Sequence, residues 1–437
     1  MSKRKQLVLG KIGYTYGGLT NKTILDFGIG KPFLPYMNIF SNGRINPQFV
    51  NYVQIYNGEK QNTVKYGDLF FTTSSETVEE VGMTSVLLDE MGEAYLNSFC
   101  FGFRLNNFDD LLPEFAPYLF RGEVMRKKIS LFGQGSTRYN LPKTELLEKL
   151  TIDLPSIPEQ RKIAQILSTA DSVIDKTQTT IAKYKAIKQG IFNDLFTRGI
   201  DIKTGKLRPK QKDAPELYKE SKLGWIPKEW ENCEFGKYIS ENLYGPRFNA
   251  RDYSANGNVK TIRGTDFTKD GTILYQQAPK ALLAIGLINS HKLENGDVVI
   301  VTTADCGLTA VFEKPINDVD FIPSAYSVKY KFTQNINPYF IKYFMATDAA
   351  IRQVNMFVRK GTIGNLPGSA ILSFEMICPD IKEQNAIVNK IKSIDNNIIS
   401  EQSYLQKLQM LKLGLMTDLL SGKKLVTVPT ELETQTT

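Results

Sequence analysis

The chain has 437 residues, which is long enough for two or more domains that each bury a core. Its hydrophobic share of 42% and charged share of 23% are typical of a globular protein, and its net charge of +8 is compatible with nucleic acid binding without proving it. The sequence has no apolar run long enough to cross a bilayer and no apolar signal-peptide core, so we expect a cytoplasmic protein without membrane contact.

The sequence offers little support for catalysis. Its four cysteines form no Cys-x-x-Cys pair, and it has one histidine, His291, so we expect no disulfide and no metal site. It has no P-loop and no Gly-rich cofactor loop. "NPYF" at 337–340 superficially resembles the Asn-Pro-Pro-aromatic site of amino-methyltransferases, but the second proline is missing, and a helix capped by Asn337 explains the stretch better. We therefore predict no catalytic residue and no cofactor bound by this chain.

The two halves of the chain carry related stretches in the same order. "GKIGYTYGG" corresponds to "GKYISENLYG", "KYGDLFFTTSS" to "ENGDVVIVTTAD", and "GSTRYNLP" to "KGTIGNLP". "LPSIPEQRKIAQILSTAD" corresponds to "CPDIKEQNAIVNKIKSID" without a gap. Because all of these matches keep a nearly constant offset, we interpret the chain as a tandem repeat.

In chain order, the repeat predicts six segments. A first mixed domain covers residues 1–150 and a first long helix 151–200. A linker rich in Gly, Pro and charges covers 201–228, with Trp225 and Trp230 expected to dock at its end. A second mixed domain covers 229–376, a second long helix 377–422, and a disordered tail 423–437. Both domains contain short apolar strand patterns such as "GDLFFTT" and "GDVVIVTT".

The two long helices have clear start signals. Ser156 with Glu159, and Asp380 with Glu383, have the spacing of a capping box, in which the Glu side chain reaches back to the cap residue. Gly199 and Gly422 follow as stop signals; the glycine beyond a helix end commonly adopts the left-handed conformation.

Apolar residues at alternating steps of four and three predict a coiled-coil seam along each helix. Thr177 and Glu401 interrupt the two seams at matching positions, and so do Lys188 and Lys412. The predicted seam residues are Ile163, Leu167, Ile174, Ile181, Tyr184, Ile191, Ile387, Ile391, Ile398, Leu405, Leu408 and Leu415.

The helices could pack on their own domains or on each other. A helix of about 35 residues is about 50 Å long, whereas a domain of about 140 residues is about 30 Å across. We therefore favour an antiparallel helix pair. The predicted fold class is α+β, with two mixed α/β domains joined by two long antiparallel coiled-coil helices in a pseudo-twofold tandem repeat.

Basic residues interleaved with aromatics lie near the divergent loops of both domains. Arg and Lys bind phosphates, and Arg also binds the O6/N7 edge of guanine, although an ordinary solvated surface is an alternative for each residue. The DNA-binding candidates are Lys22, Lys31, Arg44, Lys60, Arg138, Arg247, Arg251, Lys260, Arg263, Lys269, Arg359 and Lys360.

This pattern resembles the specificity subunits of type I restriction–modification systems. The resemblance rests on the twofold repeat, on "LPSIPEQRKIAQILSTADSVID" and on "YKESKLGWIPKEWE", and it covers nearly the whole chain. The second helix start departs from the family, with Lys382 at the usual proline. The resemblance implies a non-catalytic subunit whose two target-recognition domains each recognise half of a bipartite site in double-stranded DNA, with the helix pair setting the gap.

The resemblance also implies partners. Two methyltransferase (modification) subunits would dock on the helices and use S-adenosylmethionine, and restriction/translocase subunits would use ATP and Mg²⁺. Two alternatives stay open from the residues: a coiled-coil adaptor with two protein-binding heads, and a specificity subunit of a related bipartite-site restriction enzyme. An enzyme with its own active site is a third, for which the sequence gives no motif.

Overall fold

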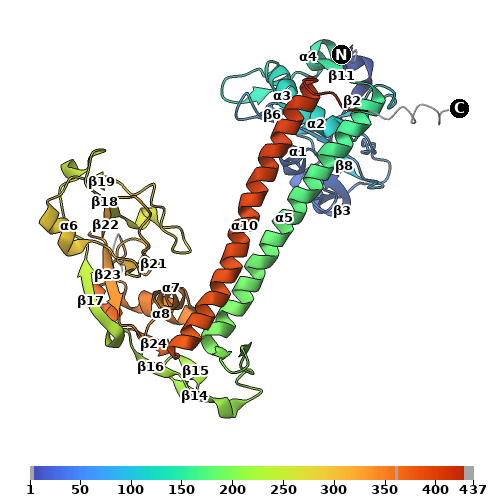
Figure 1. Ribbon diagram of the computed structural model, residues 1–437. Coiled ribbons are helices and arrows are strands. Elements are labelled where there is room, and N and C mark those ends of the chain that lie inside the picture. Colours follow the sequence, from blue (N-terminus) through green and yellow to red (C-terminus); the bar gives the residue numbers. More distant parts are fainter. Residues whose placement is uncertain (1–3, 360–362, 428–437) are drawn as a thin grey trace. The chain divides into compact units, whose positions relative to one another are not determined.

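The structure, a computed structural model, describes residues 4–359 and 363–427 (Figure 1). The chain divides into two compact units. Unit 1 comprises Met1–Thr179 with Gln402–Thr437, and unit 2 comprises Thr180–Glu401. Each unit therefore contains one mixed α/β domain together with one end of each long helix. This division differs from the predicted segments, in which the helices stood apart from the domains.

Unit 1 is built on two sheets and two short strand pairs. The antiparallel four-stranded sheet has the order β2 (Gly13–Gly17), β9 (Cys100–Leu105), β5 (Leu69–Thr72), β7 (Thr84–Val86). The three-stranded sheet has the order β4 (Asn51–Val53), β3 (Phe27–Leu34), β8 (Tyr95–Leu96), with β3 parallel to β8. β1 (Lys5–Val8) pairs with β11 (Thr151–Leu154), and β6 (Ser74–Ser75) with β10 (Tyr139–Asn140). The short helices are α1 (Tyr36–Ser41), α2 (Ala116–Arg121), α3 (Glu123–Ser130) and α4 (Lys143–Lys149).

Unit 2 repeats the two sheets of unit 1 and its pair of strands beside the long helix. Its four-stranded sheet has the order β17 (Ile239–Tyr244), β23 (Ser327–Phe332), β20 (Val298–Val301), β21 (Thr309–Val311). Its three-stranded sheet has the order β19 (Lys280–Ala281), β18 (Val259–Ile262), β22 (Asp320–Pro323), again with a parallel second pair. β16 (Glu231–Glu234) pairs with β24 (Glu375–Cys378). The short helices are α6 (Ile285–His291), α7 (Pro338–Met345), α8 (Asp348–Phe357) and α9 (Gly368–Leu372).

The predicted linker is folded. It forms one hairpin from β12 (Ile200–Asp201) and β13 (Lys206–Leu207) and another from β14 (Tyr218–Ser221) and β15 (Gly224–Pro227). Arg208 and Trp230 are buried, as expected for a docked segment, whereas Trp225 is half exposed and does not dock. The Gly, Pro and charged residues of this stretch therefore form turns between short strands.

The long helices α5 (Ile157–Thr197) and α10 (Ile381–Ser421) contain 41 residues each. Gly199 and Gly422 follow their ends with φ of 64° and 75°, as the predicted stop signals require. Every seam position is buried or half-buried, including Tyr184, Ile191, Leu405 and Leu408, while most residues between these positions are exposed. From residue 428 on, the predicted tail lies outside the described residues.

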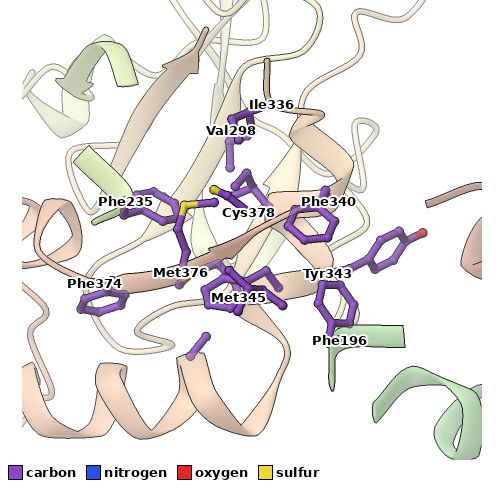
Figure 2. Packing of buried hydrophobic residues seen from close by; sticks show 14 of the residues in the cluster. Phe196, Phe235, Val298, Ile336, Phe340, Tyr343, Met345, Phe374, Met376 and Cys378 are labelled. Atoms are coloured by element: carbon purple, nitrogen blue, oxygen red, sulfur yellow. The ribbon is translucent and has the colours of Figure 1, made fainter. Parts of the chain in front are cut away.

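Both long helices also pack on the domains of their units. In unit 1, Leu167 and Leu419 belong to the same core as the four-stranded sheet. In unit 2, Phe196 of α5 lies beside Phe340 and Tyr343 of α7, as Figure 2 shows. The two packing modes considered from the sequence therefore occur together, because each helix presents one face to its partner and one to a domain.

The described residues also bear on membrane contact, metal binding and the cysteines. Among the described residues, no helix is long and apolar enough to cross a membrane, and no group of three His, Cys, Asp or Glu side chains could hold a metal ion. Cys233 and Cys378 lie on the paired strands β16 and β24, with 3.2 Å between their sulfur atoms. Their separation in the sequence hid this proximity.

Candidate nucleic-acid interface

A buried glutamine near the start of each long helix anchors it to its domain. In unit 1, Gln160 donates to the carbonyl oxygens of Asp110 and Pro155 and accepts from the N–H of Leu112. In unit 2, the equivalent glutamine bonds the carbonyl oxygens of Asn335 and Pro379 and the N–H of Asn337 in the same way; this residue is Gln384. The amide satisfies buried backbone groups that would otherwise lack partners. The capping-box pattern identifies only the preceding Glu, so this glutamine anchor is not predicted from the sequence.

The two helix starts differ in their glutamates. The Glu159 carboxylate accepts from the Ser156 N–H at 2.9 Å and from its hydroxyl at 2.7 Å, which is the expected return of a capping box. The Asp380 carboxylate accepts from the N–H groups of Lys382 and Glu383, so it caps α10.

The expected return bond from Glu383 to Asp380 is replaced by other contacts. The Glu383 carboxylate is buried and accepts from the Arg208 guanidinium, from the Trp230 indole at 3.0 Å and from the Ile200 N–H at 2.8 Å. A guanidinium in the folded linker outcompetes the local backbone N–H because a charged donor makes a stronger hydrogen bond to a buried carboxylate. Arg208 has no local sequence signal, because its partner Glu383 lies far along the chain.

The lysines that interrupt the predicted seams form ion pairs between the helices. In unit 2, the Lys188 Nζ lies 2.6 Å from Asp395 Oδ1, and the Tyr343 hydroxyl donates to the same carboxylate. In unit 1, the Asp171 carboxylate has the equivalent partners, Lys412 and Tyr118. In an antiparallel helix pair, the numbers of facing residues have a constant sum. The two ion pairs share this sum, so the helices of each unit are paired in the same antiparallel register. Burial raises the pKa of both tyrosines, which keeps their hydroxyls protonated as donors.

The Gly-Asp turns before β5 and β20 place a buried carboxylate beneath each four-stranded sheet. In unit 1, the buried Asp68 carboxylate accepts from the Arg104 guanidinium and the Tyr16 hydroxyl. In unit 2, Asp297 accepts from the N–H of Glu294, and burial raises the pKa of its carboxyl group. The turn is shared, whereas the polar contacts beneath it differ. These residues shape the framework that presents the loops.

Lys22 lies in a different setting from the one we predicted. Its side chain is only 4% exposed, and its ammonium lies 2.6 Å from the Glu59 carboxylate and 2.6 Å from the carbonyl oxygen of Gln54. It also faces the Tyr56 ring, with 5.2 Å from Nζ to the ring centroid. A lysine enclosed in this way holds a loop in place, so the structure gives no support to its predicted contact with DNA.

The other candidates of unit 1 lie on the surface. Lys31 and Arg44 are half exposed and form ion pairs with Glu93 and Asp89. Exposed pairs of this kind are weak and can exchange for phosphate. Two candidates are exposed and have no ion pair within the described part of the chain: Lys60 and Arg138.

Unit 2 divides in the same way. Lys260 is mostly buried against Asp318, with 2.7 Å between nitrogen and oxygen, and Arg263 pairs with Asp266. Lys260 therefore has a structural role. Lys360 lies outside the described residues. Four candidates are exposed without an ion pair in residues 4–359 and 363–427: Arg247, Arg251, Lys269 and Arg359.

Asn337, Pro338 and His291 have structural roles at helix ends. Asn337 caps α7 by accepting from the Tyr339 N–H at 2.9 Å, and Pro338 occupies the first turn, as predicted. His291 ends α6, where its Nδ1 lies 3.0 Å from the carbonyl oxygen of Leu287. Each residue thus serves a helix end.

A duplicated α/β framework on two long helices, with different basic residues in its two copies, is the class of protein that the fold defines. Comparison with known families identifies the family within this class. A family described as "Type I restriction modification DNA specificity domain" matches residues 10–186 and 227–410. The chain belongs to this family, which comprises specificity subunits that generally carry no catalytic site.

Curated relatives agree with this assignment. The MjaVIII specificity subunit of Methanocaldococcus jannaschii is 24% identical over 285 residues, covering 64% of this chain and 63% of the relative. The MjaX specificity subunit from the same organism, named a putative type I restriction enzyme subunit, is 23% identical over 93% of this chain and 90% of its own. The StySPI specificity subunit of Salmonella potsdam is 23% identical over 69% of this chain and 62% of its own. The matches therefore span just under two thirds of the first and third of these proteins.

Solved structures share the fold. The S subunit of a type I restriction–modification system from M. genitalium superposes with a TM-score of 0.55 at 12% identity, covering 96% of both chains. A chain from a structural study of complex assembly and conformational transition of the type I system superposes with a TM-score of 0.54 at 14% identity, covering 96% of this chain and 97% of its own. At such low identity, the superpositions support the architecture alone.

Proposed function

We propose that this chain gives a type I restriction–modification complex its DNA sequence specificity. Each unit recognises one half of a bipartite site in double-stranded DNA. The observation that carries this proposal is the duplication itself: the two units share every strand of their main sheets but differ in their exposed basic residues, which are Lys60 and Arg138 in unit 1 and Arg247, Arg251, Lys269 and Arg359 in unit 2. One framework with two sets of surface residues suits two different half-sites.

The helix pair, in this proposal, determines how many unread base pairs separate the half-sites. The continuous course of α5 and α10 over 41 residues each supports this role, as do the paired Asp171–Lys412 and Lys188–Asp395 contacts. The length of a helix pair of fixed register would set the distance between the two half-sites without changing either recognition surface.

The helices also dock two methyltransferase subunits, through which restriction/translocase subunits join. Four apolar residues of α10 support a protein partner: Tyr404, Met410, Leu411 and Leu413 are each about half exposed or more. Apolar side chains gathered on one helix are a common mark of protein contact. S-adenosylmethionine would bind the methyltransferase subunits, and ATP with Mg²⁺ the restriction subunits, while this chain would supply recognition alone.

The same apolar residues would also suit a protein-binding adaptor, so the test must detect DNA sequence. The chain is co-expressed with its genomic neighbours, the complex is purified through a tag on this chain, and duplexes are selected from a random library and sequenced. We expect a two-part motif with a fixed gap. Retention of unselected DNA that disappears uniformly with added salt would contradict the proposal, because charge attraction alone gives that behaviour.

A further inference from the structure

The two units contain the same capped turn at the edge of their three-stranded sheets. In unit 1, a 3₁₀ turn spans Ile24–Asp26 and is closed by a capping box between Thr23 and Asp26. In unit 2, a 3₁₀ turn spans Ala250–Asp252 and is closed by a capping box between Asn249 and Asp252. The carboxylate accepts from the cap N–H at 2.7 Å in unit 1 and 2.9 Å in unit 2.

The same backbone contacts attach both turns to their sheets. The carbonyl oxygen of Asp26 accepts from the N–H of Gln54 at 2.7 Å, and that of Asp252 accepts from the N–H of Leu282 at 2.8 Å. The aromatic residue that follows each turn pairs with the neighbouring strand: Phe27 opposite Val53, and Tyr253 opposite Ala281. Each turn is therefore a pre-formed feature of the framework, held at both ends.

Side chains also brace each turn. In unit 1, the Tyr56 hydroxyl donates to the second oxygen of Asp26 at 3.0 Å, and Tyr56 is itself contacted by the buried Lys22. In unit 2, the Phe248 and Tyr253 rings pack edge to face at 5.2 Å between centroids. The turn backbone is thus fixed by residues other than the two at its tip.

The two tip residues differ in chemical character between the units. Ile24 and Leu25 are each 88% exposed, although both are apolar. Their counterparts, Ala250 and Arg251, are also exposed, and Arg251 has no ion pair within the described part of the chain. The framework thus holds two exposed positions in a fixed geometry and fills them with apolar side chains in one unit and a guanidinium in the other.

We propose that these tips are base-contacting, specificity-determining residues: Ile24 and Leu25 contact thymine methyl groups in one half-site, and Arg251 binds a guanine edge in the other. This inference rests on the proposed function and deepens it. Apolar side chains favour the C5-methyl of thymine, and the Arg fork matches guanine O6 and N7. A rigid turn suits this task, because a base contact requires a side chain held at a defined distance from the groove.

The test compares tip variants in the purified complex, with the sequenced library as readout. Ile24→Ser with Leu25→Ser should lose an A·T preference at one or two positions of one half-site only. Arg251→Ala should lose a guanine preference in the other half-site, by roughly five- to a hundredfold. The untouched half-site in each experiment shows that the variant chain is folded. Leu131→Ser and Lys203→Gln, at exposed positions away from the turns, should leave the motif unchanged.

A graft tests the assignment as a gain of function. Ile24→Ala with Leu25→Arg gives unit 1 the tip of unit 2, and we expect a new guanine preference at the position that lost its A·T preference. Tip variants that keep the wild-type motif, or that blur both half-sites equally, would overturn the inference while leaving the proposed function in place. A wild-type complex that selects no two-part motif would overturn the proposed function and this assignment together.

Discussion

Lys188 of α5 and Asp395 of α10 form an ion pair 2.6 Å long, with each side chain about a quarter exposed. Lys188 interrupts the apolar seam of α5, and Lys412 and Asp171 form the same pair with the roles of the helices exchanged. An ion pair across the helix interface forms in one register of the two helices. Sliding one helix along the other would leave both charges unpaired, so the ion pair favours that register. The pairs therefore specify how the helices align.

Lys188→Met tests this role. Removing the ammonium leaves the partly buried Asp395 carboxylate with Tyr343 alone, so we expect the chain to lose about 1–3 kcal/mol of unfolding free energy. Lys188→Met with Asp395→Leu should recover much of the loss, because an apolar pair replaces the ionic one. Urea unfolding followed by circular dichroism measures both. As a control, Lys127→Met breaks the exposed Lys127–Glu123 pair, and we expect it to change the unfolding free energy far less than Lys188→Met does, because solvent screens an exposed pair.

Glu383 anchors the folded linker to the start of α10. Glu383→Gln keeps the shape but leaves the Arg208 guanidinium without its buried counter-charge, which we expect to cost about 3 kcal/mol. The Arg208–Glu229 contact does not compensate, because the Glu229 side chain is mostly exposed. Proteolysis within residues 201–228 should accelerate as the linker loosens. Glu229→Gln is the matched control, and equal protease sensitivity of the two variants would contradict this account.

The helix register determines where the spacer can be lengthened. A heptad inserted after Thr180 in α5 and another after Gln402 in α10 keep both ion pairs and both helix starts, because each insertion lies between the two ion-paired residues of its own helix. Seven residues add about 10 Å of helix. With about 3.4 Å per base pair, the gap of the selected motif should grow by about three base pairs.

The half-sites themselves should stay unchanged in this experiment. An insertion in one helix alone shifts the seam and separates an ion pair, so we expect it to destabilise the chain rather than lengthen the gap. Altered half-sites in the double insertion would show that the helices do more than set the spacing.

Glu59 gives a pH-dependent test of the unit 1 turn. Its hydrogen bond with Lys22, together with bonds from the Tyr56 N–H and Gln61, lowers the pKa of the Glu59 carboxyl to about 2 from its ordinary value of 4.5. A depressed carboxyl pKa stabilises the folded form above pH 4.5, and this contribution is lost as the pH falls through about 2. Tip contacts that depend on this network should therefore survive mild acid.

Carboxyl NMR titration measures this pKa directly. Lys22→Met should return the pKa of Glu59 toward 4.5, while the lowered pKa of Glu93, which pairs with Lys31, should stay where it is. A Glu59 pKa that does not respond to Lys22→Met would contradict the proposed bracing of the turn.

Local patterns predicted much of the architecture. The alternating apolar steps identified the two seams, one in each helix, and Gly199 and Gly422 marked the helix ends. Both predictions were possible because helix periodicity and helix termination depend on residues a few positions apart. The repeat predicted that the second domain would copy the first. The shared turn could also have been found, since "TILDF" and "NARDY" have the same order of cap residue, two variable positions, Asp and aromatic.

The sequence by itself thus determined the repeat, the two helices and their antiparallel preference. Only the tertiary structure decided that Lys22 pairs with Glu59 in an enclosed site. It also decided that Glu383 binds Arg208 and not its own helix cap, and that Ile24 and Leu25 are exposed. The physical reason is the same in each case. Whether a charged or apolar side chain is buried, paired or free for a ligand depends on segments far along the chain, and their approach is set by the packing of whole sheets and helices.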